Sequence, residues 1–181
     1  RKLVADLNLL TDKPVLYVCN VDERSAATGN AYTEAVRAAI ADERAEMLVI
    51  AAATEADIAE LEEYDERQMF LEEIGLQESG VARLIKSAYK LLNLETFFTT
   101  GADETRAWTY SRGMKAPQTA GIIHTDFEKG FIKADIVSYD DFVAAEGSMT
   151  KIKEEGKLRQ EGRDYVMQDG DIVEFKFNVS K

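Results

Sequence analysis

Two apolar segments with a helical pattern between them constrain the fold of this 181-residue chain most. Residues 14–20 and 47–53 are continuous apolar runs, a pattern typical of strands that are covered on both faces. Between them lies a set of residues at helical spacing, namely Tyr32, Val36, Ala39, Ile40 and Glu43. A strand, a helix and a second strand form a βαβ unit, whose two strands are almost always parallel. The sequence therefore predicts an α/β arrangement for this part of the chain.

Further helices are predicted between residues 54 and 93. Thr54 is a candidate N-cap, and residues 81–92 have apolar side chains at intervals of three and four, which end at Asn93. Between residues 54 and 80 there are ten carboxylates and one cation, Arg67. We interpret these carboxylates as solvent-exposed helical faces, because spacing alone does not bring metal ligands together.

The pattern changes near residue 97, where a second domain is expected to begin. Strands are predicted at residues 105–110 and 131–139 and on both sides of Asp169–Gly170–Asp171, with short helices between them. These elements predict a compact α+β domain over residues 97–181, after a first domain over residues 1–96. Leu3, Leu7 and Leu10 have helical spacing, so we expect the chain to begin partway along a helix and to be a fragment of a longer protein.

Charge and composition exclude several classes of partner. With 22 Lys and Arg against 34 Asp and Glu, the net charge is −12, which opposes binding to nucleic acid or anionic lipid through bulk charge. The single cysteine, Cys19, is interpreted as a small buried hydrophobic residue and fits a reducing compartment. The sequence has no apolar stretch of about 20 residues and no signal-peptide pattern. We therefore expect a soluble, cytoplasmic protein without a membrane partner.

Polar residues follow each of the two apolar runs, and these are the candidate ligand-binding residues. The carboxyl ends of neighbouring parallel strands meet at one edge of a sheet, where ligands of open α/β sheets bind. Asn20 offers an acceptor and two donors, and Glu23 can accept from a ring N–H or an amino group. The stretch Asn20-Val21-Asp22-Glu23 has the arrangement of the base-reading loop of P-loop GTPases, which usually reads Asn-Lys-x-Asp. Taken alone, this stretch is better explained as a turn formed by Asn and Asp.

The remaining sequence resembles one known family. The stretches GMKAPQTAGIIHTDFEKGFIKADIVSYDDFV (residues 113–143) and EGRDYVMQDGDIVEFKFNV (residues 161–179) closely resemble the C-terminal TGS domain of the YchF family, the Obg-like ATPases. AAATEADIAELEE and GLQESGVARLIKSAYKLLNLETFFTTG resemble the end of the nucleotide domain of that family. The resemblance implies the C-terminal part of a P-loop NTPase domain, followed by a TGS domain of β-grasp fold.

The resemblance also implies a function. Members of the family hydrolyse ATP, with looser use of GTP, bind Mg²⁺ with the nucleotide, and associate with the large subunit or the intact ribosome, with a possible RNA contact through TGS. The implied base-binding residues are Asn20, Val21, Glu23, Ala52 and Ala53. The Asn-x-x-Glu form relaxes guanine preference, because the usual Asp pairs with guanine N1–H and N2–H₂, which adenine lacks.

Phosphate chemistry is not expected from this chain alone. Phosphoryl transfer needs a Gly-rich loop with its Lys and Ser/Thr, whereas the only Gly-Lys pair, Gly156–Lys157, is followed by Leu158. The resemblance implies that the P-loop, the switch regions and the catalytic histidine would precede Arg1. We therefore expect no catalytic residue and no metal ligand here, and an inactive fragment.

Other conspicuous residues have structural interpretations. His124, the single histidine, is expected to have a structural or surface role, and Trp108 is expected in the core. One locally basic run is interpreted as a solvated face, or otherwise as an RNA or ribosome contact: Lys151, Lys153, Lys157, Arg159 and Arg163. The alternative function is a stand-alone TGS module that docks on the ribosome, RNA or a regulator. TGS domains also occur in threonyl-tRNA synthetase and in alarmone enzymes, so the fold alone names no ligand.

Overall fold

A computed structural model of the chain describes residues 7, 9–43, 45–101 and 104–178. The chain divides into two compact units, Arg1–Leu92 and Asn93–Lys181. This division lies four residues before the boundary expected at 96/97, because strand β3 (Leu94–Thr100), which the sequence did not predict, begins the second unit. The helix predicted at the start of the chain includes residues 1–6 and 8, which lie outside the described residues. A short 3₁₀ helix, η2, covers Leu10–Asp12.

The first unit contains the predicted βαβ arrangement. Strand β1 (Val15–Asn20) pairs in parallel with β2 (Ala45–Ile50), in a register that places Asn20 opposite Ile50. Helix α1 (Ala31–Ala39) lies between the strands in the sequence and begins with a capping box. The Asn30 side chain accepts hydrogen bonds from the backbone of Tyr32 and Thr33, while the Thr33 hydroxyl accepts from the Asn30 N–H. The parallel pairing of the two apolar runs is confirmed.

The prediction that β1 is covered on both faces, in contrast, is wrong. Val15 and Val18 are each 43% exposed, and Cys19 is half-buried rather than fully buried. The reason is that β1 and β2 form a sheet of only two strands within the described part of the chain. Helix α4 packs against both strands.

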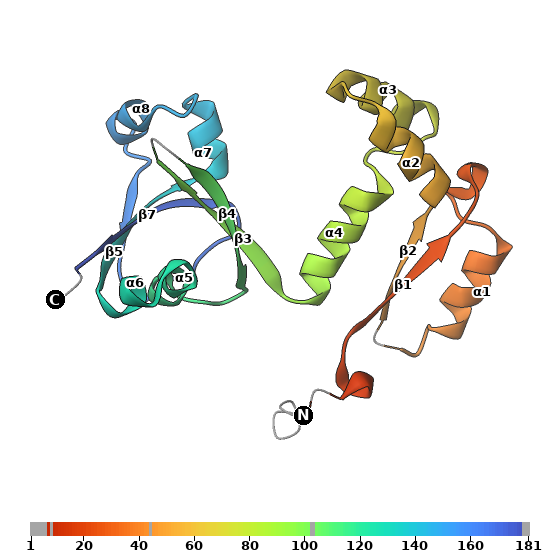
Figure 1. Cartoon of the computed structure of the whole chain (residues 1–181), viewed down its shortest axis with the longest axis horizontal. Helices are drawn as coiled ribbons and strands as arrows, with labels where there is room; N and C mark the ends of the chain where they lie inside the picture. The colour runs from red at the N-terminus through yellow and green to blue at the C-terminus, as the bar shows by residue number, and fades with distance from the viewer. Residues whose placement is uncertain (1–6, 8, 44, 102–103, 179–181) are drawn as a thin grey trace. The chain divides into compact units, whose positions relative to one another are not determined.

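Three helices follow β2 and complete the first unit (Figure 1): α2 (Ala52–Glu60), α3 (Tyr64–Glu73) and α4 (Gly80–Leu91). The predicted helix over residues 81–92 is confirmed as α4, and Asn93 follows its C-cap with a φ of 57°, a left-handed conformation that Asn tolerates. The predicted cap at Thr54 is wrong. Helix α2 begins two residues earlier, and Thr54 is buried within its first turn, with 2% of its surface exposed.

The second unit is a mixed five-stranded sheet of order β4-β3-β7-β5-β6 with four short helices. Its remaining strands are β4 (Thr105–Ser111), β5 (Phe131–Ser138), β6 (Arg159–Glu161) and β7 (Asp171–Phe177). Its helices are α5 (Ala116–Ile123), α6 (Thr125–Lys129), α7 (Tyr139–Ala144) and α8 (Met149–Glu154). The strands predicted over 105–110 and 131–139 are confirmed. Of the two expected around residues 169–171, only the second forms; the segment before it contributes one isolated bridge, between Lys115 and Val166.

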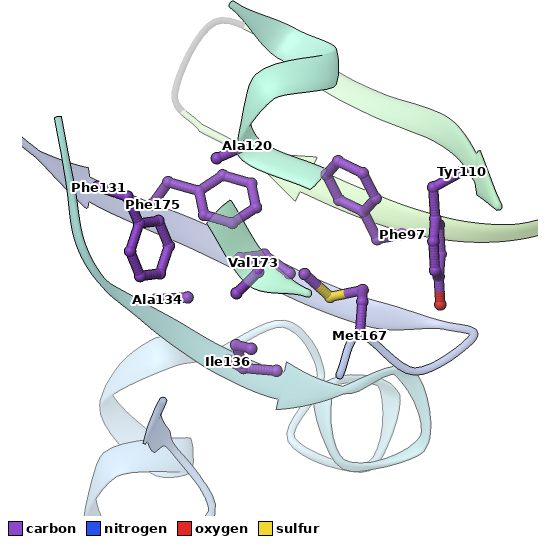
Figure 2. Packing of buried hydrophobic residues seen from close by; sticks show 10 residues of the cluster. Phe97, Tyr110, Ala120, Phe131, Ala134, Ile136, Met167, Val173 and Phe175 are labelled. Carbon is purple, nitrogen blue, oxygen red and sulfur yellow. The ribbon is translucent and has the colours of Figure 1, made fainter. Parts of the chain in front are cut away.

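Alternate residues of this sheet enter two cores. Phe97, Ile136 and Val173 belong to the larger core, which α5 closes with Ala116 and Ala120, and Figure 2 shows these aromatic and aliphatic side chains converging. Ile172 and Val137, one position along, belong to a smaller core with α7 and α8. Because side chains alternate along a strand, the two cores lie on opposite faces of the sheet.

Trp108 and His124 lie in the second unit. Trp108 packs partly buried against the larger core, as predicted, and its indole N–H donates to the Thr99 hydroxyl at 2.9 Å. His124 caps α6, where its Nδ1 accepts from the Asp126 N–H at 3.2 Å, which is a structural role. No helix within the described ranges is long and apolar enough to cross a membrane.

Candidate functional site

The carboxyl ends of β1 and β2 are tied together by two hydrogen bonds. The Val21 N–H donates to the Ile50 carbonyl at 2.8 Å, which continues the parallel ladder by one residue. The Asn20 Oδ1 accepts from the Ala52 N–H at 2.9 Å, across 32 residues of sequence. The two loops that the sequence singled out therefore form one edge of the sheet.

Asn20 uses only its side-chain oxygen to hold the two loops together. Its side chain is exposed, and its amide NH₂ makes no hydrogen bond to any residue that the structure describes. Two donors therefore remain available beside the loops, and an amide NH₂ can donate to a ring nitrogen or a carbonyl of a ligand. Asn20 can thus position the loop and contact a ligand at the same time.

Glu23 lies one turn further along the first loop. Asp22 caps the short 3₁₀ helix η3 (Glu23–Ser25) by accepting from the Ser25 N–H at 3.0 Å. This cap occupies the Asp22 carboxylate and leaves the Glu23 side chain exposed, without an ion pair or side-chain hydrogen bond to another described residue. Glu23 lines a surface hollow together with Arg24 and three residues at the end of α3: Phe70, Glu73 and Ile74.

Ala52 and Ala53 form the first turn of α2 and not the end of a strand. Strand β2 stops at Ile50, and the chain enters the helix through Ala51. No side chain local to the helix caps it. Asn20 supplies the acceptor for the Ala52 N–H from the other loop, which explains why Thr54 is not needed as a cap. Both alanines are exposed beside Asn20, so their small side chains leave the edge open.

Glu55 supports this arrangement, and sequence reasoning missed it. It was counted among the solvent-exposed carboxylates, but its two oxygens accept from the Gly80 N–H at 2.6 Å and the Val81 N–H at 3.0 Å. The first turn of α2 is thereby attached to the first turn of α4, where a carboxylate also interacts favourably with the helix dipole. A Cβ at Gly80 would lie 2.8 Å from the Glu55 Oε1 and 2.9 Å from a methyl of Ile50. The only feature of the sequence that could have indicated this contact is a glycine at the start of a helix.

The basic run of the second unit is largely engaged in contacts within that unit. Lys157 forms ion pairs with Asp141 and Glu155, which raise the pKa of its ammonium. Arg159 Nη2 contacts the buried Asp171 at 3.2 Å, and Arg163 donates to the Phe131 carbonyl at 2.8 Å. Lys151 and Lys153, on α8, are the two cations of this run whose side chains form neither an ion pair nor a hydrogen bond with another described residue.

No group of three or more His, Cys, Asp or Glu side chains within the described ranges could hold a metal ion. The carboxylates of residues 54–80 lie along α2, α3 and the segments around them. They do not converge as ligands.

Comparison with known proteins identifies relatives over nearly the whole chain. Residues 94–178 match the family model YchF-GTPase_C, described as "Protein of unknown function (DUF933)". The chain is 55% identical over 181 residues to the ribosome-binding ATPase YchF of Bacillus subtilis, covering 99% of this chain and 49% of that protein. It is 44% identical over 174 residues to Obg-like ATPase 1 of Rattus norvegicus, covering 94% of this chain and 43% of that protein.

A solved structure agrees with these matches. The Schizosaccharomyces pombe YchF GTPase superposes with a TM-score of 0.83 at 33% identity, over 97% of this chain and 46% of that one. A GTP-binding protein from Pyrococcus horikoshii shares the fold at 19% identity, with a TM-score of 0.62 over 98% of this chain and 55% of that one. The chain spans about half the length of the relatives it matches. Over that half, the chain belongs to the YchF family of Obg-like ATPases.

Proposed function

We propose that this chain is the base-reading half of the nucleotide site of a YchF-like ATPase, joined to a TGS domain of β-grasp fold. The observation that carries the proposal is the hydrogen bond from Ala52 N–H to Asn20 Oδ1, which holds the two loops at one edge. The exposed, unpaired carboxylate of Glu23 lies beside this edge, as a group that reads the donor atoms of a base must.

In this proposal each residue contacts the base and none takes part in bond breaking. Asn20 donates through its amide NH₂, and Val21 offers backbone atoms to the adenine amino group. Glu23 accepts from a base N–H, while Ala52 and Ala53 line the edge with a small surface. The P-loop, the switch regions and the groups that bind Mg²⁺ belong to another part of the longer protein. That protein hydrolyses ATP, and GTP less readily, in the cytoplasm, where it binds the ribosome.

The names of the relatives support this assignment, since proteins half covered by this chain are named ribosome-binding ATPases. The second unit, by the same proposal, contributes one contact with the ribosome or RNA. Its two unpaired lysines on α8 favour a local contact rather than an extended one. A stand-alone binding module remains the second candidate, and the absence of a Gly-rich phosphate loop from the natural gene product would favour it.

Nucleotide titration tests the proposal. Isothermal titration of ATP into this chain alone should show no micromolar binding, whereas the full-length protein should bind ATP and hydrolyse it. Micromolar binding by the chain alone would contradict the division of the site. A full-length protein that lacks ATPase activity and nucleotide binding would favour the stand-alone module.

Base selectivity tests the assigned residues directly. In the full-length protein, Glu23→Asp combined with Val21→Lys restores the Asn-Lys-x-Asp form and should shift preference toward GTP. The ratio of the two Kd values is the measurement. An unchanged ratio in a folded variant would refute the assignment of this loop to the base.

A further inference from the structure

Helix α3 presents an apolar side chain to solvent within a ring of carboxylates. Met69 is 71% exposed. Asp65 and Glu66 precede it by four and three residues, and Glu72 and Glu73 follow it by three and four, so all four are its neighbours on the helix surface. All five side chains are exposed. We refer to these five residues as the α3 face.

The α3 face borders a hollow with an apolar lining. Leu61, Met69 and Phe70 contribute its apolar surface, and Glu66, Glu72 and Glu73 contribute carboxylates to it. Leu61 and Phe70 are half-buried, while Met69 lies open to solvent. Methionine is flexible and polarizable, and exposed methionines adapt to apolar side chains of different shapes. A partner can therefore insert an apolar side chain here.

The carboxylates of the α3 face have no partner within the chain. None of the four forms an ion pair or a side-chain hydrogen bond with any residue in the described ranges. The one cation of the segment, Arg67, is occupied by the carbonyls of Leu61, at 2.7 Å, and Glu62, at 3.3 Å. Glu72 and Glu73 also lie in the last turn, where the helix dipole disfavours negative charge. The helix dipole favours Asp65 and Glu66 in the first turn but does not explain Glu72 and Glu73, and a cationic ligand would relieve the repulsion among the four carboxylates.

We propose that the α3 face is a docking surface for a Lys- and Arg-rich protein segment that places an apolar side chain in the hollow. Opposite charges steer such a segment to the ring of carboxylates and fix its register. Phosphate backbones and anionic lipid are repelled by the same ring. A second copy of this chain, with net charge −12, is also a poor match. The segment belongs to a protein of the ribosome, a source that rests on the proposed ribosome binding of the whole protein.

Site-specific crosslinking tests which macromolecule contacts this face. The full-length protein, carrying the photoreactive residue p-benzoylphenylalanine at position 69, is irradiated with purified ribosomes. We expect a crosslink to a ribosomal protein within a Lys- and Arg-rich segment. The same residue at position 32 is the matched control, because Tyr32 is 84% exposed on α1 and lies outside the α3 face. A crosslink from position 69 to RNA, or none although the protein cosediments with ribosomes, would overturn the proposal.

Charge removal tests the role of the ring. Asp65→Asn, Glu66→Gln and Glu72→Gln together should lower ribosome affinity in low salt by roughly tenfold or more and weaken its salt dependence. The control removes three exposed carboxylates of the first unit outside the α3 face, through Glu34→Gln, Asp42→Asn and Asp57→Asn. Circular dichroism verifies that both variants are folded. Equal affinity of the two triple variants would refute the docking surface alone. No cosedimentation of the unsubstituted protein would instead refute ribosome binding itself, and this proposal with it.

Discussion

Substitution of Glu55 by alanine should destabilise the first unit substantially. The change removes the acceptor of two backbone N–H groups, at 2.6 and 3.0 Å, and hydrogen bonds to a charged group contribute about 1.5–3 kcal/mol each. Gly80 is buried, so its N–H loses its partner without replacement, while water can partly replace the carboxylate at the exposed Val81. We therefore expect a loss of about 2–4 kcal/mol in the free energy of unfolding.

Urea denaturation followed by far-UV circular dichroism measures this loss. With an m-value of about 2 kcal/mol/M, the midpoint of the first unit should fall by roughly 1–2 M. Trp108, the only tryptophan, belongs to the second unit, so its fluorescence transition should keep its midpoint. Glu55→Gln retains one acceptor oxygen and should lose about half as much. Glu60→Ala, an exposed carboxylate at the end of α2, should change stability by less than about 0.5 kcal/mol. A Glu55→Ala variant as stable as Glu60→Ala would refute the reasoning.

Three further predictions concern the base edge and the second unit. Asn20→Ala should weaken ATP binding by the full-length protein about tenfold or more, measured with a fluorescent ATP analogue; unchanged affinity would exclude Asn20 from the site. Gly130→Ala places a Cβ in steric clash with the Asn178 carbonyl oxygen and should lower the Trp108 unfolding midpoint, whereas Gly162→Ala, with nothing within 4 Å, should not. Burial and the hydrogen bond donated to Asp171 raise the pKa of Tyr165 to about 12. The unfolded chain therefore loses this proton first, and stability falls between about pH 10 and 12; Tyr165→Phe should flatten that fall in denaturation midpoints.

The spacing of apolar residues predicted most elements of the first unit, because this spacing depends only on residues close together in the sequence. The run from Pro14 to Asn20 gave β1, and the spacing of residues 81–92 gave α4. Asn93 marked the end of α4, since its left-handed conformation is a local property of that residue type. Thr54 failed as a cap because the acceptor for the start of α2 comes from Asn20, 32 residues away in the sequence. A local pattern cannot report such a contact.

The same distinction applies to the candidate site and to the second unit. Asn20 and Glu23 could be proposed as candidate site residues because they lie at the end of an apolar run and just after it. Glu55 was not, because its partners on α4 are 25 and 26 residues away. Strand β3 was not predicted because its sequence, LETFFTT, shows no strict alternation of apolar and polar residues. It is stabilised by pairing with β4 and β7. The exposure of β1 depends on how many strands the sheet has, which the β1 sequence does not encode.

The position of β7 has a consequence for the order in which the second unit can fold during synthesis. This strand is the last one in the described part of the chain but lies between β3 and β5, and it pairs Phe98 with Ile172 across 74 residues. Until residues 171–177 are translated and have left the ribosome, β3 and β5 have no common neighbour and both cores lack a strand. The β3–β4 hairpin can form early, but the unit as a whole is expected to fold in one late step, once β7 is available.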